Sequence, residues 1–532
     1  MINHKKEKKT DLTLRKTILP TWLSDAAFYE VYPQSFYDTN GDGIGDLNGI
    51  TSKLDYIASL GCNAIWINPC FVSPFKDAGY DIADYLMVAP RYGTNKDLYN
   101  LFSKAHEKGM HILLDLVPGH TSEQHEWFLQ SSLPFANEYT NRYIWTDTAW
   151  TAPQDFRCIS GRFDRNGNYL VNFFSTQPAL NYGFARVTES WQLPVTHPDC
   201  LATREAMKDV MRFWLDKGCD GFRVDMAASL VKNDNDNKAT AEIWSDVRKM
   251  YNKNYPEAVL VSEWSNPELA LKSGFHVDFY LDHPGNGYHS LFRLKDPKTG
   301  EPLGFFSKNG KGDISLFVDD YLKRYQNSKD YGYISFITGN HDTPRMRRTL
   351  NETELKLAYA FIFTMPGVPF LYYGDEIGMR YVEGLISKEG GYDRTGSRTP
   401  MQWNKEINYG FSKASEEKLY IPLDTSSDAP TVETQISDPQ SLLNTVTQII
   451  HLRHANVDLQ ANSSFTVLYA QKGAYPFIYR RGELIIAINP SANSVSVPIN
   501  IMGTILFSLG ELPTRSEHET NMAPQSFVIV QP

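Results

Sequence analysis

The chain alternates short apolar stretches with amphipathic ones, and this alternation predicts a (β/α)8 barrel as the main fold. Helical stretches such as "TNKDLYNLFSKAHEKG" and "LATREAMKDVMRFWLDKG" lie between apolar ones. Strands that alternate with helices favour a parallel sheet, and eight units fit a closed barrel, although the pattern alone also fits a doubly wound sheet. In chain order, the expected strands are "FYEVYP", "AIWINP", "ILLDLVP", "GFRVDM", "AVLVSEW", "HVDFYLD", "ISFITGNHD" and "FLYYGDE".

Two regions outside this rhythm predict further domains. Residues 119–198 are rich in aromatic residues, Asn and Asp, show no helical period, and are too long for an ordinary connection. A small inserted domain is therefore expected after the third strand. Residues 461–532 read as alternating strands with turns at "RRGE" and "NPSANS", which predicts a C-terminal antiparallel β-sandwich. The barrel is expected over 25–118 and 199–460, after a flexible N-terminal tail over 1–24.

The composition argues against several kinds of partner. The 532 residues carry a net charge of −10, so binding to nucleic acid or to an anionic membrane is not expected. No signal peptide is evident, and the most apolar run is broken by Pro366, Gly367 and Pro369. The five cysteines show no CxxC spacing, which favours reduced core thiols. A cytoplasmic protein without an organic cofactor is therefore expected, and nothing in the sequence indicates its oligomeric state.

The stretch "GFRVDM" places an arginine and an aspartate on one face of its strand, because Arg223 and Asp225 are two residues apart. Alone, this pair fits a surface ion pair on an edge strand. Other expected strands also end in polar residues, and in a parallel barrel such positions form the active site. Two carboxylates that flank a bond can act as nucleophile and general acid in glycoside hydrolysis. The further strand-end residues are Asp115, His120, Glu263, His341 and Asp342.

Four motifs carry a family resemblance. "DLVPGH", "GFRVDM", "VSEW" and "TGNHD" occur in the order and spacing typical of the α-amylase superfamily, glycoside hydrolase family 13. "GCNAIWINP", "GVPFLYYGDEIGM" and "RTPMQW" extend the resemblance over nearly the whole chain after residue 25. "QPALNYG" and "RTPMQW" are most similar to the branch of α-glucosidases, oligo-1,6-glucosidases and trehalose synthases.

The resemblance implies three catalytic carboxylates. Asp225 corresponds to the nucleophile that forms a glycosyl-enzyme, and Glu263 to the general acid and base. Asp342 corresponds to the carboxylate that holds sugar hydroxyls. Arg223 is expected to contact the site and to keep the nucleophile ionised. The acid must keep its proton near neutrality, so Glu263 is expected in the drier setting, beside Trp264.

The resemblance also implies a sugar pocket. His120 and His341 are similar to histidines that bond the hydroxyls of the cleaved glucose, and Tyr80 to its stacking platform. Asp77 and Arg398 correspond to a charged pair that closes the pocket beyond a non-reducing end; the alternative for Arg398 is a structural ion pair. The inserted domain is expected to line the same pocket with Phe173 and Gln177.

Three positions limit the assignment to a subfamily. Gly119 stands where the family usually has Asn, which weakens the expectation of a calcium site like that of true α-amylases. Ala179 replaces the acid of the usual QPDLN pattern. Met226, which follows the nucleophile, occupies a position associated with linkage preference, but a methionine does not decide between α-1,4 and α-1,6 bonds.

The stretch "DTNGDGIGD" resembles the first part of an EF-hand loop, although Gly49 stands where the closing glutamate would be. An Asx-rich turn is the alternative. Because the α-glucosidase branch often has calcium at this loop, a structural Ca²⁺ site is expected there. Its predicted ligands are Asp38, Asn40, Asp42, Ile44 through its carbonyl, and Asp46.

The sequence therefore predicts a retaining, exo-acting α-glucosidase that hydrolyses short α-glucosides of the maltose or isomaltose type. The nearest alternative is a trehalose synthase or another glucosyl transferase or isomerase that uses the same covalent intermediate. A remote alternative is a non-catalytic relative that serves as the heavy subunit of a transporter. The presence of all three carboxylates and the absence of a membrane span argue against it.

Overall fold

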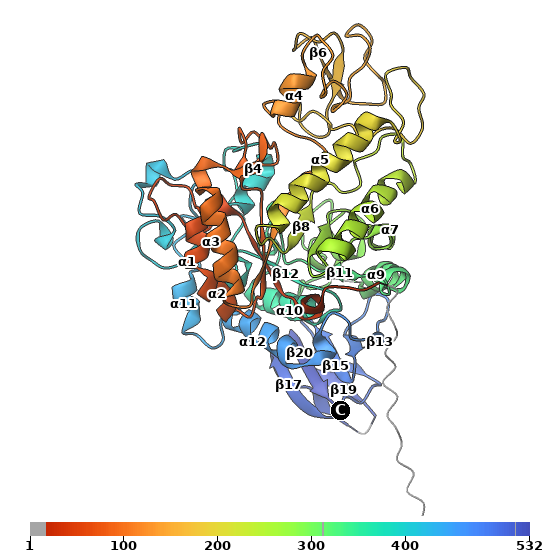
Figure 1. The fold of residues 1–532 in the computed structure, drawn as a ribbon. Coiled ribbons are helices and arrows are strands. Elements are labelled where there is room, and N and C mark those ends of the chain that lie inside the picture. The colour runs from red at the N-terminus through yellow and green to blue at the C-terminus, as the bar shows by residue number, and fades with distance from the viewer. Residues whose placement is uncertain (1–16, 311–312, 517) are drawn as a thin grey trace, which may run out of the picture.

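The computed structural model describes residues 17–310, 313–516 and 518–532. Figure 1 shows a central barrel, a smaller unit around α4 and β6 at one end of the molecule, and the strands of the C-terminal region at the opposite end. The inserted and C-terminal regions therefore cover different ends of the barrel.

Each of the eight expected apolar stretches contains one strand of a single parallel sheet, and the predicted (β/α)8 barrel is confirmed. Every residue of β1, β2, β8 and β9 is buried, which explains why these strands read as continuous apolar runs. The sheet order is β11-β10-β9-β8-β5-β2-β1-β12. The strands are β1 (Phe28–Val31), β2 (Ala64–Ile67), β5 (His111–Leu116), β8 (Gly221–Val224), β9 (Val259–Ser262), β10 (Val277–Phe279), β11 (Tyr333–Ser335) and β12 (Phe370–Tyr372).

The two end strands of this sheet, β11 and β12, are joined through the segment that follows β11. Phe370 N donates to the carbonyl of Phe336, and Thr338 N donates to the carbonyl of Phe370, each at 2.9 Å. These bonds place β12 beside the segment that follows β11. The barrel is therefore nearly closed, and an open doubly wound sheet is excluded.

Helices surround the barrel, and side chains next to their first turns cap them. At the start of α3, the Thr94 side chain accepts from Asp97 N while the Asp97 side chain accepts from Thr94 N, which is a capping box. The helices are α1 (Leu47–Ser52), α2 (Leu54–Ser59), α3 (Asn95–His106), α5 (Pro198–Leu215), α6 (Lys238–Asn254), α7 (Pro267–Ser273), α8 (Gly287–Phe292), α9 (Ile314–Ser328), α10 (Glu352–Thr364), α11 (Val432–Ile436) and α12 (Leu442–Ala455).

Two segments inserted between barrel elements bring residues toward the active site. The predicted inserted domain contains α4 (Glu126–Ser131) and the hairpin of β6 (Cys158–Ser160) and β7 (Asn168–Leu170). Ala179 is fully buried in its small core, against Ile144, Leu170 and Phe184. A second hairpin, β3 (Phe71–Val72) and β4 (Asp84–Val88), interrupts the connection between β2 and α3. The sequence did not predict this second hairpin.

The C-terminal region is antiparallel, as predicted. Five strands form one sheet in the order β13-β14-β15-β20-β17, and three form another in the order β16-β19-β18. Apolar residues from both sheets share one core cluster. The strands are β13 (Phe465–Tyr469), β14 (Phe477–Arg481), β15 (Leu484–Asn489), β16 (Val495–Val497), β17 (Thr504–Leu509), β18 (Thr514–Arg515), β19 (Thr520–Met522) and β20 (Ser526–Gln531).

The predicted tail over 1–24 requires a correction. Residues 1–16 lie outside the described residues, but the segment after them packs on the barrel. The Trp22 ring stacks on His111 with centroids 3.8 Å apart, and Leu23 is fully buried. Arg248 Nη2 also donates to the Ile18 carbonyl at 2.6 Å. This anchoring was missed because a single Trp–Leu pair has no periodic pattern.

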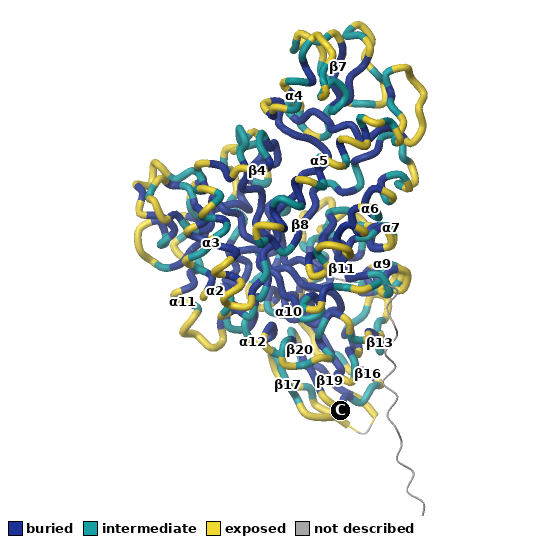
Figure 2. Tube along the Cα trace, viewed as in Figure 1, coloured by how far each residue is buried: buried dark blue, intermediate teal, exposed yellow. Residues whose placement is uncertain are grey.

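Burial follows the barrel, with buried segments at its centre and exposed ones on the outer turns (Figure 2). The five cysteines are free thiols, and all except Cys158 are buried. None of the helices in the described parts of the chain is long and apolar enough to cross a membrane.

Candidate active site

The carboxyl ends of the barrel strands bring the three predicted catalytic carboxylates to one pocket. Asp225 follows β8, Glu263 follows β9, and Asp342 lies in the segment after β11. The pocket has a volume of about 100 Å³. It is lined by Asp77, Tyr80, His120, Phe173, Asp225, Met226, Glu263, Asp342 and Arg394.

A buried arginine connects two of these carboxylates. Arg223 Nη1 lies 3.1 Å from Asp225 Oδ1, and its Nη2 lies 2.9 Å from Glu263 Oε2. The same Nη1 also donates to Asp115 at 2.9 Å, and the Arg223 side chain is only 1% exposed. The pair in "GFRVDM" is therefore a buried ion pair in which Asp225 lines the pocket, and not a surface ion pair.

The exposure of Asp225 and Glu263 is the reverse of the expected order. The Glu263 side chain is 21% exposed and that of Asp225 is 11% exposed, so the prediction that Glu263 lies in the drier setting is wrong. Trp264, expected to shield it, packs with its ring against Phe275. Glu263 Oε2 instead accepts from Met226 N at 2.9 Å, as well as from the guanidinium.

The surroundings of Asp225 favour the protonated form of its carboxyl group. Burial raises the pKa of its carboxyl well above the ordinary value, and the nearby Glu263 raises it further, whereas Arg223 lowers it. Arg223 bonds both carboxylates, and it is the group that opposes this effect and favours the anionic form of Asp225.

Asp342 lies in a different electrostatic setting. Burial opposes its ionisation, yet His341 and two arginines hold the pKa of this carboxyl well below its usual range. Burial likewise disfavours the charged form of His341, but Asp342 and Glu30 together raise the pKa of this imidazole to about 9. His341 Nδ1 lies 2.8 Å from Glu30 and its Nε2 lies 3.2 Å from Asp342. These contacts favour an ionised Asp342 beside a protonated His341 at neutral pH.

The Tyr80 ring forms one wall of the pocket. It stacks on His341 with centroids 5.3 Å apart. Its hydroxyl donates to Asp115 at 2.9 Å and contacts His341 Nε2 at 2.8 Å. These bonds fix the ring, which suits the predicted role as a stacking platform.

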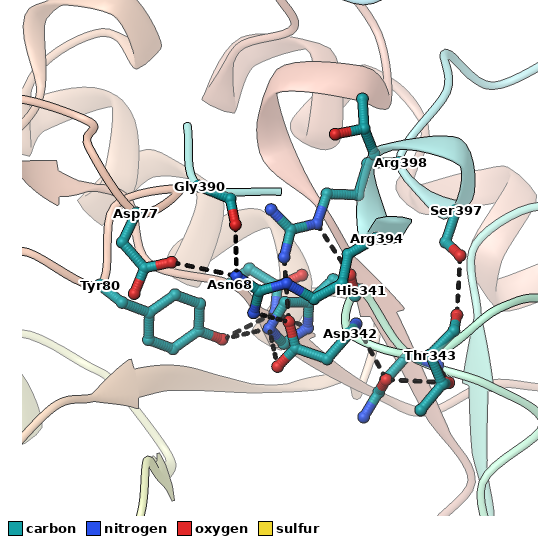
Figure 3. Close-up of polar contacts among 12 residues, drawn as sticks. Asn68, Asp77, Tyr80, His341, Asp342, Thr343, Gly390, Arg394, Ser397 and Arg398 are labelled. Atoms are coloured by element: carbon teal, nitrogen blue, oxygen red, sulfur yellow. Dashed lines mark hydrogen bonds and ion pairs between the residues drawn. The ribbon is translucent and has the colours of Figure 1, made fainter. Parts of the chain in front are cut away.

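Asp77 and an arginine form another wall, but the arginine is not the predicted one. Arg394 Nη2 lies 3.4 Å from Asp77, and its Nη1 lies 2.7 Å from Asp342 (Figure 3). Gln177 Nε2 donates to the second oxygen of Asp77 at 2.8 Å. Burial raises the pKa of Asp77 to about 6, against the opposing effects of Arg394 and Gln177.

The predicted pairing of Asp77 with Arg398 is therefore corrected. Arg398 Nε donates to the His341 carbonyl at 2.8 Å, and its Nη2 bonds Asp342 at 2.9 Å. Its side chain is 2% exposed, whereas that of Arg394 is 20% exposed. Arg398 lies behind Asp342, and Arg394, four residues earlier on the same turn, reaches the pocket surface.

The inserted domain adds further residues to the pocket. Phe173 lines the pocket and is 41% exposed, so it lies at the entrance. His120 lines it from the end of β5 and is 1% exposed. Gly119 leaves open the space that the amide of Asn172 occupies, because a Cβ at residue 119 would lie 2.7 Å from Asn172 Nδ2.

The predicted calcium loop is a closed network of hydrogen bonds. The Asn40 and Asp42 side chains each accept from the N–H two residues later, as in Asx turns. A carboxylate has about four acceptor positions, and Asp38 uses that many. Its donors are the N–H groups of Asn40, Gly41 and Gly43 and the hydroxyl of Ser412.

Asp46 is similarly engaged, with Thr39 N, the Thr39 hydroxyl and Gly49 N as donors. In this conformation the two buried carboxylates do not offer the open oxygens that Ca²⁺ needs. Among the residues described, no group of three or more His, Cys, Asp or Glu side chains is arranged to hold a metal. Calcium at this loop, including the Ile44 carbonyl, stays a prediction.

Several residues of the site escaped the sequence interpretation. Glu30 carried a signal, because it is a charged residue inside a strand whose residues are all buried. Asn68, which contacts His341 Nδ1 at 3.0 Å, directly follows the next strand of the chain. Arg394 lies in a short 3-10 helix, Tyr392–Ser397, and Asn172 in an irregular segment. No periodic pattern could have identified those two.

Comparison with known proteins agrees with this geometry. The family model of the α-amylase catalytic domain matches residues 30–462. The trehalose synthase/amylase of Mycolicibacterium smegmatis is 34% identical over 490 residues, covering 82% of this chain and 77% of the relative. The oligo-1,6-glucosidase of Heyndrickxia coagulans is 30% identical over 542 residues, covering 89% and 93%.

A solved structure extends the likeness to the whole fold. A variant of isomaltulose synthase from Erwinia rhapontici, in complex with its natural substrate sucrose, superimposes with a TM-score of 0.79 at 25% identity. The match covers 97% of this chain and 99% of that one. The chain belongs to the α-amylase family of glycoside hydrolases.

Proposed function

We propose that the protein is a retaining, exo-acting α-glucosidase that hydrolyses short α-glucosides through a covalent glycosyl-enzyme. The observation that carries this proposal is the wall formed by Asp77 and Arg394, which closes the pocket on the side of Asp342. A pocket closed beyond one sugar accepts a chain end and excludes the interior of a long chain.

The carboxylates supply the two displacements that this reaction needs. Asp225 attacks the anomeric carbon while Glu263 gives its proton to the departing glycosidic oxygen. Water then attacks the same carbon, Glu263 takes a proton from that water, and Asp225 leaves as a carboxylate. Arg223 bonds both side chains, so it pairs with the anionic Asp225 in the free enzyme and with the anionic Glu263 in the glycosyl-enzyme.

The remaining pocket residues would hold the glucose. The ionised Asp342 accepts from sugar hydroxyls, and Tyr80 offers a ring that is fixed by its own hydroxyl bonds. His120 Nε2 has no hydrogen-bond partner among the described residues and belongs to a pocket-lining side chain. A sugar hydroxyl would satisfy that nitrogen.

The substrate panel that tests the proposal is maltose, isomaltose, sucrose and trehalose, each incubated separately with products resolved by chromatography. We expect glucose from maltose or isomaltose, and early NMR spectra that show the α anomer, because two displacements retain configuration. Release of β-glucose at early times would contradict the covalent route.

A trehalose synthase activity is the second candidate, because the relative that is 34% identical over 490 residues carries that name. It would use the same glycosyl-enzyme but return glucose to a second glucose in place of water. Conversion of maltose mainly to trehalose, with little free glucose, would favour it. A non-catalytic transporter subunit has no support, since all three carboxylates line one pocket.

A further inference from the structure

The surroundings of His120 determine what this side chain can offer to a sugar. Burial lowers the pKa of its imidazole to about 3, in spite of the opposing effect of the Tyr80 backbone, so the ring is neutral at physiological pH. A neutral imidazole has one N–H donor and one acceptor nitrogen, and its neighbours decide which is which. His120 Nδ1 lies 3.3 Å from Asn172 Nδ2, whereas Nε2 has no partner among the described residues.

The orientation of the Asn172 amide follows from two independent contacts. Lys232 Nζ, which can only donate, lies 3.1 Å from Asn172 Oδ1. Ser229 Oγ donates to the Met226 carbonyl at 2.9 Å, so its oxygen must accept from Asn172 Nδ2, 3.1 Å away. Both contacts place the amide nitrogen, and not its oxygen, toward His120.

The tautomer of His120 follows from this orientation. An amide nitrogen only donates, so the Nδ1 atom that faces it must accept. The ring proton then lies on Nε2. The pocket therefore receives an N–H donor from this histidine and not an acceptor.

Gly119 makes this arrangement possible. A Cβ at this position would lie 2.7 Å from Asn172 Nδ2 and 3.1 Å from Ser229 Oγ. A side chain at residue 119 would therefore displace the amide from His120. The close approach of Asn172 and Ser229 to this position is possible because residue 119 has no side chain.

We propose that Asn172 is a positioning residue that fixes His120 as an Nε2–H donor toward a hydroxyl or ring oxygen of the bound sugar. Lys232 holds the amide in the required orientation, and Gly119 leaves the space for it. This inference rests on the proposed function for the identity of the ligand. The tautomer itself is a property of the free protein.

The first test is a double-mutant cycle on kcat/KM for the best substrate of the panel. Asn172→Ala should lower kcat/KM by between about twofold and tenfold, the range expected for one neutral hydrogen bond. In a His120→Gln background, the same change should have no further effect, because Asn172 acts through the histidine. Asn141→Ala, which removes an amide bonded to Asp199 elsewhere in the inserted domain, is the matched control. Equal losses in both backgrounds would overturn the proposal.

The second test reads the tautomer without any substrate. Protein labelled with ¹⁵N-histidine is compared with the His120→Gln variant, which identifies the resonances of His120. The native protein should show a protonated Nε2 and an unprotonated Nδ1. Asn172→Asp places a carboxylate oxygen beside Nδ1 and should move the proton to that nitrogen. A protonated Nδ1 in the native protein would refute the assignment, even if the enzyme hydrolysed maltose as proposed.

Gly119→Ala gives an independent check. It should lower kcat/KM about as much as Asn172→Ala, and the two changes combined should be no worse than Asn172→Ala alone. Additive losses would show that Gly119 acts by another route. A normal melting temperature for each variant confirms that the fold survives.

Discussion

Arg223 pairs with Glu263, and their Nη2 and Oε2 atoms lie 2.9 Å apart. The same buried guanidinium also pairs with Asp225 and Asp115. One cation thus holds the predicted nucleophile and the predicted acid in fixed positions at neighbouring strand ends. This arrangement gives the most direct prediction for catalysis.

Glu263→Gln should lower turnover strongly while the fold survives. The amide keeps the shape and can still contact Arg223, but it cannot give a proton to the leaving oxygen. General acid catalysis contributes roughly 10²–10⁴-fold, so we expect a loss in kcat of that order for substrates with poor leaving groups. Asp225→Ala should lose activity to at least the same extent, because no glycosyl-enzyme can form.

Steady-state kinetics with maltose and with an aryl glucoside check this prediction. The aryl glucoside carries a good leaving group, so Glu263→Gln should impair its cleavage less than that of maltose. Glu242→Gln, an exposed glutamate on α6, is the control and should behave as the native enzyme. A Glu263→Gln enzyme that retained most of its activity on maltose would overturn the assignment.

The sequence placed the three carboxylates at strand ends, because parallel strands are buried apolar runs and polar residues mark where they end. The catalytic roles of these carboxylates stay predictions. "GFRVDM" fixes Arg223 and Asp225 on one face whatever the loops do. The error with Arg398 has a different origin. Arg394 and Arg398 lie four residues apart around one turn, and only the path of that turn decides which of them reaches Asp77.

The expectation for Glu263 failed for a related reason. Trp264 is adjacent in sequence, but its ring contacts Phe275, while Glu263 extends toward Arg223. Neighbouring residues at a strand end point to different sides, so sequence adjacency does not imply shielding. Asn172 was missed because an irregular segment carries no period from which its position could be derived. The β3–β4 hairpin was missed because β3, with only two residues, is too short to show an alternating pattern.

Arg394→Ala should open the pocket wall. The change removes the ion pairs to Asp77 and Asp342, and hydrogen bonds to charged groups contribute about 1.5–3 kcal/mol each. We expect kcat/KM for maltose to fall by between about tenfold and a hundredfold. The ratio of soluble-starch to maltose hydrolysis should rise, because a chain could then extend past the non-reducing glucose.

Arg348→Ala is the control for this variant, since Arg348 pairs with Glu383 and its side chain is 38% exposed. Its activity ratio should match that of the native enzyme. If the native enzyme already cut the interior of soluble starch as fast as it cut maltotriose, the wall would not exist. Arg394→Ala would then leave the ratio unchanged.

His341 should make the stability of the protein depend on alkaline pH. Its pKa is raised from 6.5 to about 9 by Asp342 and Glu30, in spite of burial. A raised pKa stabilises the fold fully below the unfolded value of about 6.5, and this contribution is lost as pH rises through 9. A shift of this size corresponds to a free energy on the order of 3 kcal/mol.

Denaturant unfolding at pH 6 and at pH 10 checks this prediction on the native protein and on His341→Gln. The difference in unfolding free energy between the two proteins should be large at pH 6 and should shrink at pH 10. His451→Gln serves as the control, because that exposed imidazole contacts only the Ser59 carbonyl among the hydrogen bonds of the described residues. A difference that stayed constant over this range would mean that His341 is neutral in the folded protein.

The loop "DTNGDGIGD" gives the last prediction, that calcium stabilises the fold without taking part in catalysis. The loop lies after β1 and outside the set of residues that line the pocket. An ion that binds only the native state raises stability by RT ln(1 + [L]/Kd), which is about 2.7 kcal/mol at a hundredfold excess over Kd. Binding would require Asp38 and Asp46 to exchange part of their present hydrogen bonds for the ion, whereas the exposed Asp42 uses only its Oδ1 in the hydrogen bonds of the described residues. We therefore expect chelation to lower the melting temperature while activity at room temperature persists, and Asp42→Ala to abolish the response to calcium. Coincident melting curves for chelated and calcium-loaded protein, with no calcium found by elemental analysis, would show that the loop is only a hydrogen-bonded turn.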